Sequence, residues 1–319
     1  MADDLSAAPR STPIRDADGQ PELIEAVPLR HPGRWIAATI IVLLLALFIY
    51  GAATNSAYDW STYGTYLFDQ RVSQAALITI DLTIVAMILG VGLGVLLAVM
   101  RLSPNPVLRS VAWLYLWFFR GTPVYVQLVF WGLFTTIYGH LAVGIPFVHQ
   151  FWHFDISKVG AFFWFAVIGL GLNEAAYMAE IVRAGISSVG EGQTEAATAL
   201  GMSWPLMMRR VVLPQAMRVI IPPTGNELIS MLKTSSLVVA VPYSFDLYAR
   251  TRDIGNALYR PVPLLLVAST WYLAITSVLM IGQYFLEKRF ARGASRKLTG
   301  RQLRALAEAD NLRHGAGAR

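Results

Sequence analysis

The chain has no cysteine among its 319 residues. This absence excludes disulfide bonds, iron–sulfur clusters and zinc sites with thiolate ligands. Of the five histidines, only His149 and His153 are spaced so that a helix would bring two ligands close together. The aromatic residues between them and the nearby Pro146 are typical of a loop at a membrane surface. The sequence therefore predicts no metal site.

Charged residues are scarce: they make up 14% of the chain, whereas hydrophobic residues make up 55%. Soluble domains carry about 25% charged residues, so this composition favours a membrane protein. The net charge of +6 does not indicate nucleic-acid binding, because residues 287–319 carry nine Lys/Arg and three acidic residues and account for all of it. Such a tail after an apolar run is typical of a cytoplasmic segment that attracts anionic lipid.

Nucleotide-binding and catalytic motifs are also missing. No Gly-x-x-x-x-Gly-Lys-Ser/Thr sequence occurs, so the chain cannot hold ATP phosphates in that way. The glycines between Gly90 and Gly94 lie inside an apolar run with no strand before them, which is wrong for a nucleotide-binding loop. No Ser/His/Asp set or pair of carboxylates suggests an enzyme. Any energy-driven activity must therefore draw on another subunit.

Apolar runs long enough to cross a membrane recur along the chain, each near the roughly 20 residues that a helix needs. They predict an all-α integral membrane protein with about six transmembrane helices, at residues 35–53, 77–100, 121–138, 160–181, 216–241 and 261–286. Residues 1–34 are polar and are predicted to be a disordered cytoplasmic segment. A signal peptide is the alternative for 35–53, but the polar lead is too long for one, so we expect this helix to be retained.

The segments between the runs carry further predictions. We expect 54–74, 140–158 and 243–260 to be outside loops, and 111–119 to lie along the inner membrane interface. Gly90 and Gly94 are four residues apart and would let another helix approach closely. Pro222 and Pro223 are predicted to interrupt the fifth run and to leave backbone carbonyls free.

The distribution of Lys and Arg gives the orientation. Five of the 26 fall in the outside segments and Lys233 falls within a run, so the remaining twenty lie on the other side. Positive residues accumulate in cytoplasmic loops, so both termini are predicted to be cytoplasmic.

The loop 185–214 joins the fourth and fifth runs on the cytoplasmic side. Its residues 193–200 are good helix formers, and Gly201 can end that helix with a positive φ. Ser203 is a suitable N-cap for a second helix, which we expect to close at Arg209 and Arg210 before Pro214 breaks the chain. A helix–turn–helix of this size has little to bury by itself and is therefore expected to bind a partner.

The same loop resembles the cytoplasmic loop of ABC importer permeases. The resemblance rests on its fixed positions, with Val211 where isoleucine is usual: Glu195, Ala196, Ala197, Gly201, Leu213 and Pro214. The stretches 119–123 and 177–183 resemble the polar amino acid branch of that family. The likeness spans residues 77–286 and implies a five-helix permease domain, to which the helix 35–53 is added in front and the basic cytoplasmic tail 287–319 behind.

The resemblance also implies function and partners. The six loop residues would contact an ATPase dimer that binds ATP and magnesium, since this chain needs no cofactor of its own. A second permease subunit, identical or homologous, and an extracytoplasmic solute-binding protein would complete an importer in the plasma (inner) membrane. Membrane lipid is the remaining partner, and nucleic acid is not expected.

Two groups of polar residues are candidates for function. Arg120, Glu180 and Arg183 lie near the inner ends of their runs, where they are either a gate or ATPase contact, or a lipid anchor and a structural ion pair. In the fifth run, Asn226, Ser230 and Lys233 share one helix face and Glu227 lies on the adjoining face. These four residues are candidates for the substrate path, because Glu227 and Lys233 could bind the two charges of an amino acid. Alternatively, they pair internally and stabilise helix packing.

The sequence thus predicts the permease subunit of an ATP-driven importer of polar amino acids, without an ATPase site of its own. One alternative keeps the permease and changes the solute to an opine or a compatible solute. A secondary transporter or channel would need repeated halves or an acidic proton relay, and a membrane enzyme would need a catalytic set.

Overall fold

The computed structural model describes residues 32–138, 140–145, 149–155 and 159–290, and it divides the chain into two units at Ser56/Ala57. The first unit contains one helix, α1 (Pro32–Thr54), which includes the predicted helix 35–53. The large apolar side chains of α1 from Trp35 to Tyr50 are exposed. A helix of 23 residues with apolar side chains on every side is suited to a lipid environment.

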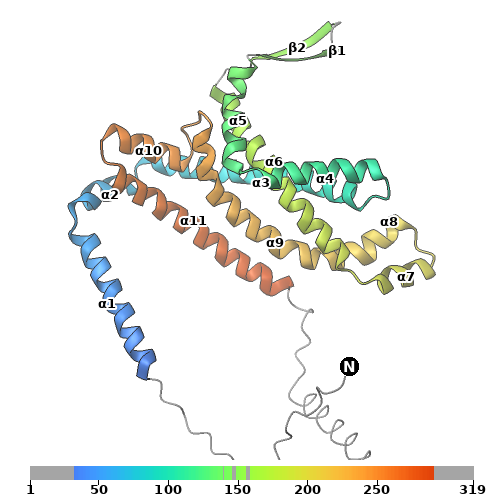
Figure 1. Ribbon diagram of the computed structural model, residues 1–319, viewed down its shortest axis with the longest axis horizontal. Coiled ribbons are helices and arrows are strands. Elements are labelled where there is room, and N and C mark those ends of the chain that lie inside the picture. The colour runs from blue at the N-terminus through green and yellow to red at the C-terminus, as the bar shows by residue number, and fades with distance from the viewer. Residues whose placement is uncertain (1–31, 139, 146–148, 156–158, 291–319) are drawn as a thin grey trace, which may run out of the picture. The chain divides into compact units, whose positions relative to one another are not determined.

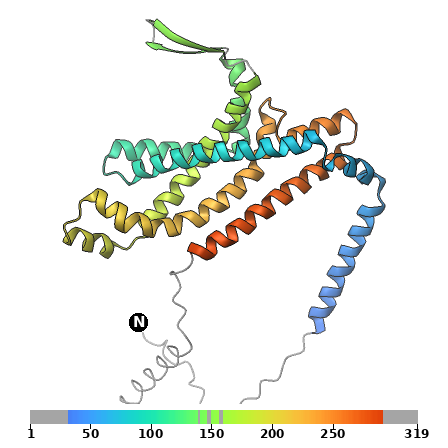
Figure 2. The ribbon, with the colours of Figure 1, turned by 180° about the vertical axis from the view of Figure 1, so that it is seen from behind.

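The second unit is almost entirely helical. Figures 1 and 2 show α4 returning alongside α3, and α9 and α11 running side by side. Its elements in chain order are α2 (Trp60–Leu67), α3 (Gln70–Leu102), α4 (Pro106–Gly121), α5 (Val124–Ile137), β1 (His140–Ile145), β2 (His149–Asp155), α6 (Val159–Ser187), α7 (Glu191–Ala199), α8 (Trp204–Met207), a π-helical segment (Met208–Val212), α9 (Leu213–Thr234), a 3-10 segment (Ser235–Ala240), α10 (Leu247–Ala257) and α11 (Pro261–Phe290).

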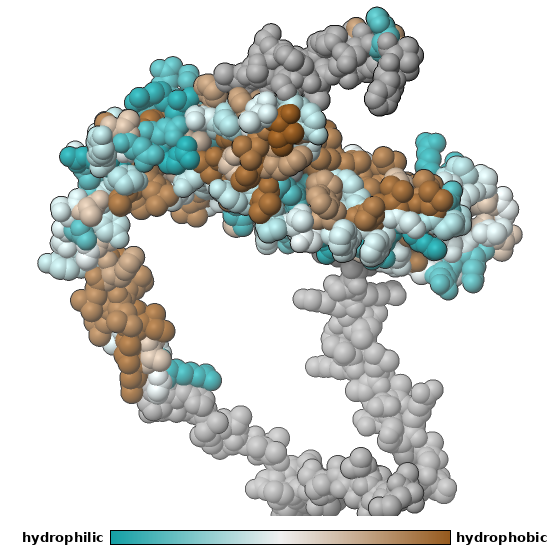
Figure 3. Space-filling view, turned by 45° about the horizontal axis from the view of Figure 1, so that its top comes forward, coloured by the Kyte–Doolittle hydropathy of each residue, from teal (hydrophilic) through white to brown (hydrophobic). Residues whose placement is uncertain are grey.

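The second unit has the surface of a membrane protein. Hydrophobic residues cover its middle and hydrophilic residues gather at both ends (Figure 3). Among the described residues, four helices are long and apolar enough to cross a membrane, at 33–54, 70–102, 161–187 and 261–290. Helix α5 is apolar but has only 14 residues, and α9 carries polar side chains. The six predicted transmembrane helices therefore differ in how strongly each resembles a full span.

Helices α3 and α6 form the centre of the second unit. A Cβ atom added at Gly90 would lie 2.7 Å from Glu174 Cγ, and one added at Gly94 would lie 3.1 Å from the Ala175 carbonyl oxygen. Only glycine permits so close a contact, so the prediction that Gly90 and Gly94 admit a neighbouring helix is confirmed. This contact also fixes Glu174 against α3.

Several predictions about local structure are wrong. The expected loop 54–74 contains α2 and the start of α3, and the expected loop 140–158 contains the antiparallel hairpin β1–β2. Residues 111–119 lie in α4, which packs along α3 and α6. The hydroxyl of Tyr115 donates to the Leu172 carbonyl oxygen (2.7 Å), near the midpoint of α6.

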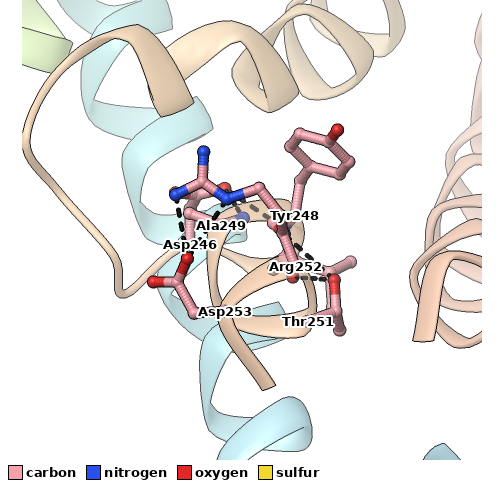
Figure 4. Close-up of polar contacts among 7 residues, drawn as sticks. Asp246, Tyr248, Ala249, Thr251, Arg252 and Asp253 are labelled. Atoms are coloured by element: carbon pink, nitrogen blue, oxygen red, sulfur yellow. Dashed lines mark hydrogen bonds and ion pairs between the residues drawn. The ribbon is translucent and has the colours of Figure 1, made fainter. Parts of the chain in front are cut away.

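Helix α10 forms most of the predicted outside segment 243–260, and the backbone amides of its first turn have hydrogen-bond acceptors (Figure 4). Asp246 Oδ2 accepts from the Tyr248 and Ala249 amides at 3.1 Å. The Leu247 amide donates to Thr79 Oγ1 of α3 (2.8 Å), which attaches α10 to the centre of the unit. Burial raises the pKa of Asp246 to about 6, although these two amides act in the opposite direction.

Candidate functional site

The candidate site starts at a break between α4 and α5. Proline has no amide hydrogen, so Pro123 leaves the carbonyl of Phe119, four residues earlier, without its helical partner. Thr122, the residue before the proline, is extended (φ −113°, ψ 141°), as expected from steric contact with the proline ring. Helix α4 therefore ends at Gly121, and α5 leaves in a different direction (Figures 1 and 2).

Two amide side chains satisfy the backbone at this break. Asn173 Nδ2 and Gln127 Nε2 both lie 3.1 Å from the Phe119 carbonyl oxygen and donate to it. Gln127 Nε2 also reaches the Thr122 carbonyl oxygen (3.1 Å) and Thr122 Oγ1 (2.7 Å), and Gln127 Oε1 accepts from Asn173 (3.1 Å). Gln127 is only 6% exposed, so water does not reach these polar groups, and the hydrogen bonds within the protein satisfy them instead.

A cavity of about 350 Å³ lies next to the break, between α5, α6 and α9. It is bounded by nine residues: Val124 of α5; Leu170, Asn173, Glu174 and Tyr177 of α6; and Glu227, Ser230, Met231 and Thr234 of α9. Asn173 thus joins the cavity to the network that holds the break.

The cavity is acidic. Glu174 is 6% exposed, and its Oε1 atom has no hydrogen-bond partner in the described residues. Glu227 faces the same cavity, and neither carboxylate has an ion pair within the described part of the chain. A buried carboxylate without a partner is unfavourable, so Glu174 and the partly buried Glu227 are polar groups for which packing alone gives no reason.

The structure separates the predicted substrate-path residues into two sets. Glu227 and Ser230 line the cavity, whereas Asn226 and Lys233 are exposed and do not line it. Pro222 and Pro223 lie within the continuous helix α9, so the predicted interruption is wrong. The Pro222 carbonyl oxygen is not free either, because Gln283 Nε2 of α11 donates to it (2.8 Å).

Sequence reasoning missed the α6 side of the cavity. Asn173 and Glu174 were not among the predicted site residues, and they lie at the middle of α6, which spans 159–187. Two adjacent polar residues in the centre of an apolar run were the signal that could have identified them, because side chains of this kind must face protein or water.

The structure brings Arg120, Glu180 and Arg183 together and adds Arg101. Glu180 accepts from Arg101 Nη1 and Arg183 Nε, both at 2.8 Å, and Arg120 Nη1 lies 3.8 Å away. The Arg120 guanidinium also stacks over Tyr177, a residue of the cavity wall, at 5.6 Å from the ring centre. This cluster links the ends of α3, α4 and α6 next to the cavity.

The loop 185–214 has the predicted first helix and turn. Gly201 has φ +72°, and its amide and that of Met202 donate to the Thr198 and Ala197 carbonyl oxygens, a glycine-terminated helix end. Glu195 and Ala196 are exposed, whereas Ala197 is buried within the chain.

The second half of the loop differs from the prediction. Helix α8 starts after Ser203 but does not close at Arg209 and Arg210, because a π-helical segment joins it directly to α9. Leu213 and Pro214 are exposed in the first turn of α9, directly after the π-helical segment, in which the Leu213 amide donates to the Met208 carbonyl oxygen five residues earlier. Pro214 therefore does not break the chain.

Comparisons with known proteins support the resemblance to ABC importer permeases. A permease of the arginine transport system of Corynebacterium glutamicum, ArgU, is 64% identical over 292 residues, which is 91% of this chain and 90% of that protein. The histidine/lysine/arginine/ornithine permease HisM of Salmonella typhimurium is 36% identical and covers 69% of this chain and 90% of its own length. A crystal structure of an amino acid ABC transporter with histidines has a TM-score of 0.60 and 31% identity, covering 71% of this chain and 97% of that chain.

Residues 90–292 match the family described as binding-protein-dependent transport system inner membrane component. The match includes the break, the cavity and the 185–214 loop. It sets aside the alternatives of a secondary transporter, a channel or a membrane enzyme. The chain belongs to this family and is the membrane-spanning permease subunit of an ABC importer.

Proposed function

We propose that this permease imports cationic amino acids such as arginine. The observation that carries the proposal is the pair of carboxylates, Glu174 and Glu227, on one cavity of about 350 Å³ between membrane-spanning helices. Two carboxylates match the two positive groups of arginine, its ammonium and its guanidinium. Planar guanidinium groups also form paired hydrogen bonds with carboxylates, which a neutral side chain cannot do. The substrates named for the two relatives agree with this chemistry.

Energy comes from partner subunits in this proposal. The exposed residues Glu195 and Ala196, with Ala197, Gly201, Leu213 and Pro214, form the contact to an ATPase dimer, which binds ATP and magnesium. The exposed Leu200 and Trp204 beside them supply apolar area for that contact. Closure of the ATPases moves the loop, and α9 carries the movement to Glu227 and Ser230.

The remaining partners follow from exposed polar groups and from the family. A second permease subunit covers Asn226 and Lys233, because lipid would reject their side chains. A solute-binding protein delivers the amino acid from outside. The Glu180 cluster acts as the inner gate, since Arg120 connects it to Tyr177 on the cavity wall. Both termini are cytoplasmic and the protein lies in the inner membrane.

Substitution of the carboxylates tests the cargo. In proteoliposomes that contain the whole complex, Glu174→Gln and Glu227→Gln should each lower arginine uptake by about tenfold or more, since a hydrogen-bonded charge is worth about 1.5–3 kcal/mol. Asp253→Asn on α10 is the matched control and should transport normally, because Asp253 pairs with Arg252 at 2.8 Å and does not line the cavity. Unchanged arginine uptake in both glutamine variants would contradict the proposal.

Glycine substitutions test the coupling loop. A Cβ at Gly201 would meet open space within this chain, so the effect of Gly201→Val on the loop itself comes from its positive φ. We expect this variant to weaken co-purification of the ATPase or to separate ATP hydrolysis from uptake, and Gly201→Asn to have a smaller effect. Gly190→Val is the control, because Gly190 also faces open space but has φ −58°. Equal behaviour of the two valine variants would contradict the assignment.

The absence of cysteine makes the orientation easy to test. Thr198 in α7 and Asn256 in α10 are both exposed, so single-cysteine variants at these sites need no further background changes. In intact cells, a membrane-impermeant thiol reagent should label Asn256→Cys, and it should label Thr198→Cys only after permeabilisation. The reverse pattern would overturn the proposed orientation.

A further inference from the structure

The first turn of α5 points to a second feature of the cavity. The first backbone hydrogen bond of this helix is from the Gln127 amide to the Pro123 carbonyl oxygen (3.2 Å). Pro123 is its N-cap and provides no side-chain acceptor. The amides of Val124, Tyr125 and Val126 consequently have no acceptor within the described residues, and Val124 lines the cavity.

The break is what keeps these amides available. In an uninterrupted helix they would donate to the carbonyls of residues 120, 121 and 122, four positions earlier. Here the Thr122 carbonyl accepts from Gln127 Nε2 instead, and the same side chain and Asn173 hold the Phe119 carbonyl. Gln127 and Asn173 thus maintain an open helix start in the middle of the membrane-spanning body.

A second, independent observation points to a ligand at the same place. Glu174 is 94% buried, lines the cavity with Val124 and has one carboxylate oxygen without a hydrogen-bond partner in the described chain. Val124, which stands at the positive end of the α5 helix dipole and has an unpaired amide, therefore lies on one wall of the cavity, and the carboxylates lie on the other walls. A ligand that satisfies both walls must carry a negative and a positive group.

We propose that the first turn of α5 binds the α-carboxylate of the transported amino acid. This inference rests on the proposed function, in which Glu174 and Glu227 bind the positive groups. Helix starts bind carboxylates through unpaired amides and the dipole, and broken transmembrane helices place such starts near the middle of the membrane. The site selects amino acids over amines that have the same side chain, and Gln127 and Asn173 act as positioning residues.

A proline substitution removes one of the proposed amides without another polar change. Pro123 already has ψ 134°, the conformation required before a proline, and proline is tolerated at the first helical position, so Val124→Pro fits the backbone. Val124→Ala is the matched control, because it shortens the same side chain and keeps the amide. Both variants are compared as the complete permease–ATPase complex in lipid nanodiscs.

The readout is competition against radiolabelled L-arginine by unlabelled L-arginine or by agmatine, which is arginine without its carboxylate. For the unmodified complex we expect agmatine to compete at least about tenfold less well than arginine. Relative to Val124→Ala, Val124→Pro should weaken arginine binding by about three- to tenfold, and the two variants should bind agmatine equally. Equal competition by arginine and agmatine in the unmodified complex, or an equal loss for both ligands in Val124→Pro, would overturn the proposal.

A second pair of variants covers the case in which Val124→Pro does not assemble. Pro123→Asp places a fixed carboxylate at the N-cap, where it occupies the free amides and repels that of the substrate, and Pro123→Asn is the neutral control. The preference for arginine over agmatine should fall in the aspartate variant relative to the asparagine variant, and an unchanged preference would contradict the site. If the complex imports a neutral amino acid instead, the cationic cargo is wrong, and the same comparison with the matching amine still decides the carboxylate site.

Discussion

Two proline segments in this permease have opposite effects on their helices. At Pro123 the backbone leaves the helical conformation and the chain separates into α4 and α5. At Pro222 and Pro223 two successive prolines lie inside α9, which continues from Leu213 to Thr234. Proline lacks the same amide hydrogen in both places, so the outcome depends on what surrounds it.

The two segments differ in which side chains donate hydrogen bonds to the backbone carbonyl oxygens near the prolines. At the break, Gln127 and Asn173 supply three donor contacts to the Phe119 and Thr122 carbonyl oxygens, which stabilises the non-helical backbone. In α9, one side chain, Gln283, donates to the Pro222 carbonyl oxygen, and α9 packs against α6 and α11 along its length. A transmembrane helix opens at a proline when neighbouring side chains bond the opened backbone, and it remains closed when packing holds it straight.

The largest expected effect is the loss of the network at the break. Gln127→Met keeps the length of the side chain but removes its Nε2 donors, leaving acceptors unsatisfied around a side chain that is 6% exposed. We expect the free energy of unfolding to fall by about 1–3 kcal/mol, measured by thermal unfolding of the detergent-solubilised subunit.

The matched control is Gln283→Met at the other proline segment. This substitution removes one contact to α9, a helix that its packing already supports, and one exposed contact to Glu287 within α11, so the loss should be smaller, at about 1 kcal/mol or less. If Gln283→Met destabilised the protein as much as Gln127→Met, the two prolines would not differ in the way described.

The sequence predicted those features that depend on interactions between residues close together in the chain. Local patterns predicted the helices and the positive φ of Gly201, because apolar runs and glycine at a helix end act within a few residues. The close contact at Gly90 and Gly94 was predicted because small residues four apart mark a helix contact surface.

The location of the helix break was not predictable in this way. A double proline looks more disruptive than a single one, and so the break was expected at Pro222 and Pro223. The decisive donor at Pro123 is Asn173, which lies 54 residues away from Phe119 in the sequence. The α6 half of the cavity, with Glu174, was missed for the same reason, since only tertiary packing places it opposite Glu227.

The second prediction restores the missing donor at the break. Pro123→Ala provides an amide hydrogen that can return to the Phe119 carbonyl and extend α4 into α5. Stability should change little, but the open helix start beside Val124 should be lost in part of the molecules, and arginine uptake should fall by about three- to tenfold. Uptake by proteoliposomes at equal protein content measures this.

Pro106→Ala is the control for that substitution. Pro106 occupies the first position of α4 and interrupts nothing, so its replacement should leave uptake unchanged. A fall in uptake of the same size in both variants would mean that the effect does not come from the break.

The smallest effect is expected from Pro222→Ala and Pro223→Ala. The backbone is already helical there, and the contact from Gln283 uses the carbonyl oxygen of residue 222, which alanine also provides. The new amides can donate to the carbonyls of Arg218 and Val219, four residues earlier, so the free energy of unfolding should rise by no more than about 1 kcal/mol. Arginine uptake should remain close to that of the unmodified complex, because Glu227 and Ser230 keep their places on the cavity wall. A loss of uptake comparable to that of Pro123→Ala would show that the double proline shapes the path after all, and that a helix can be continuous in its hydrogen bonding and still depend on its prolines for function.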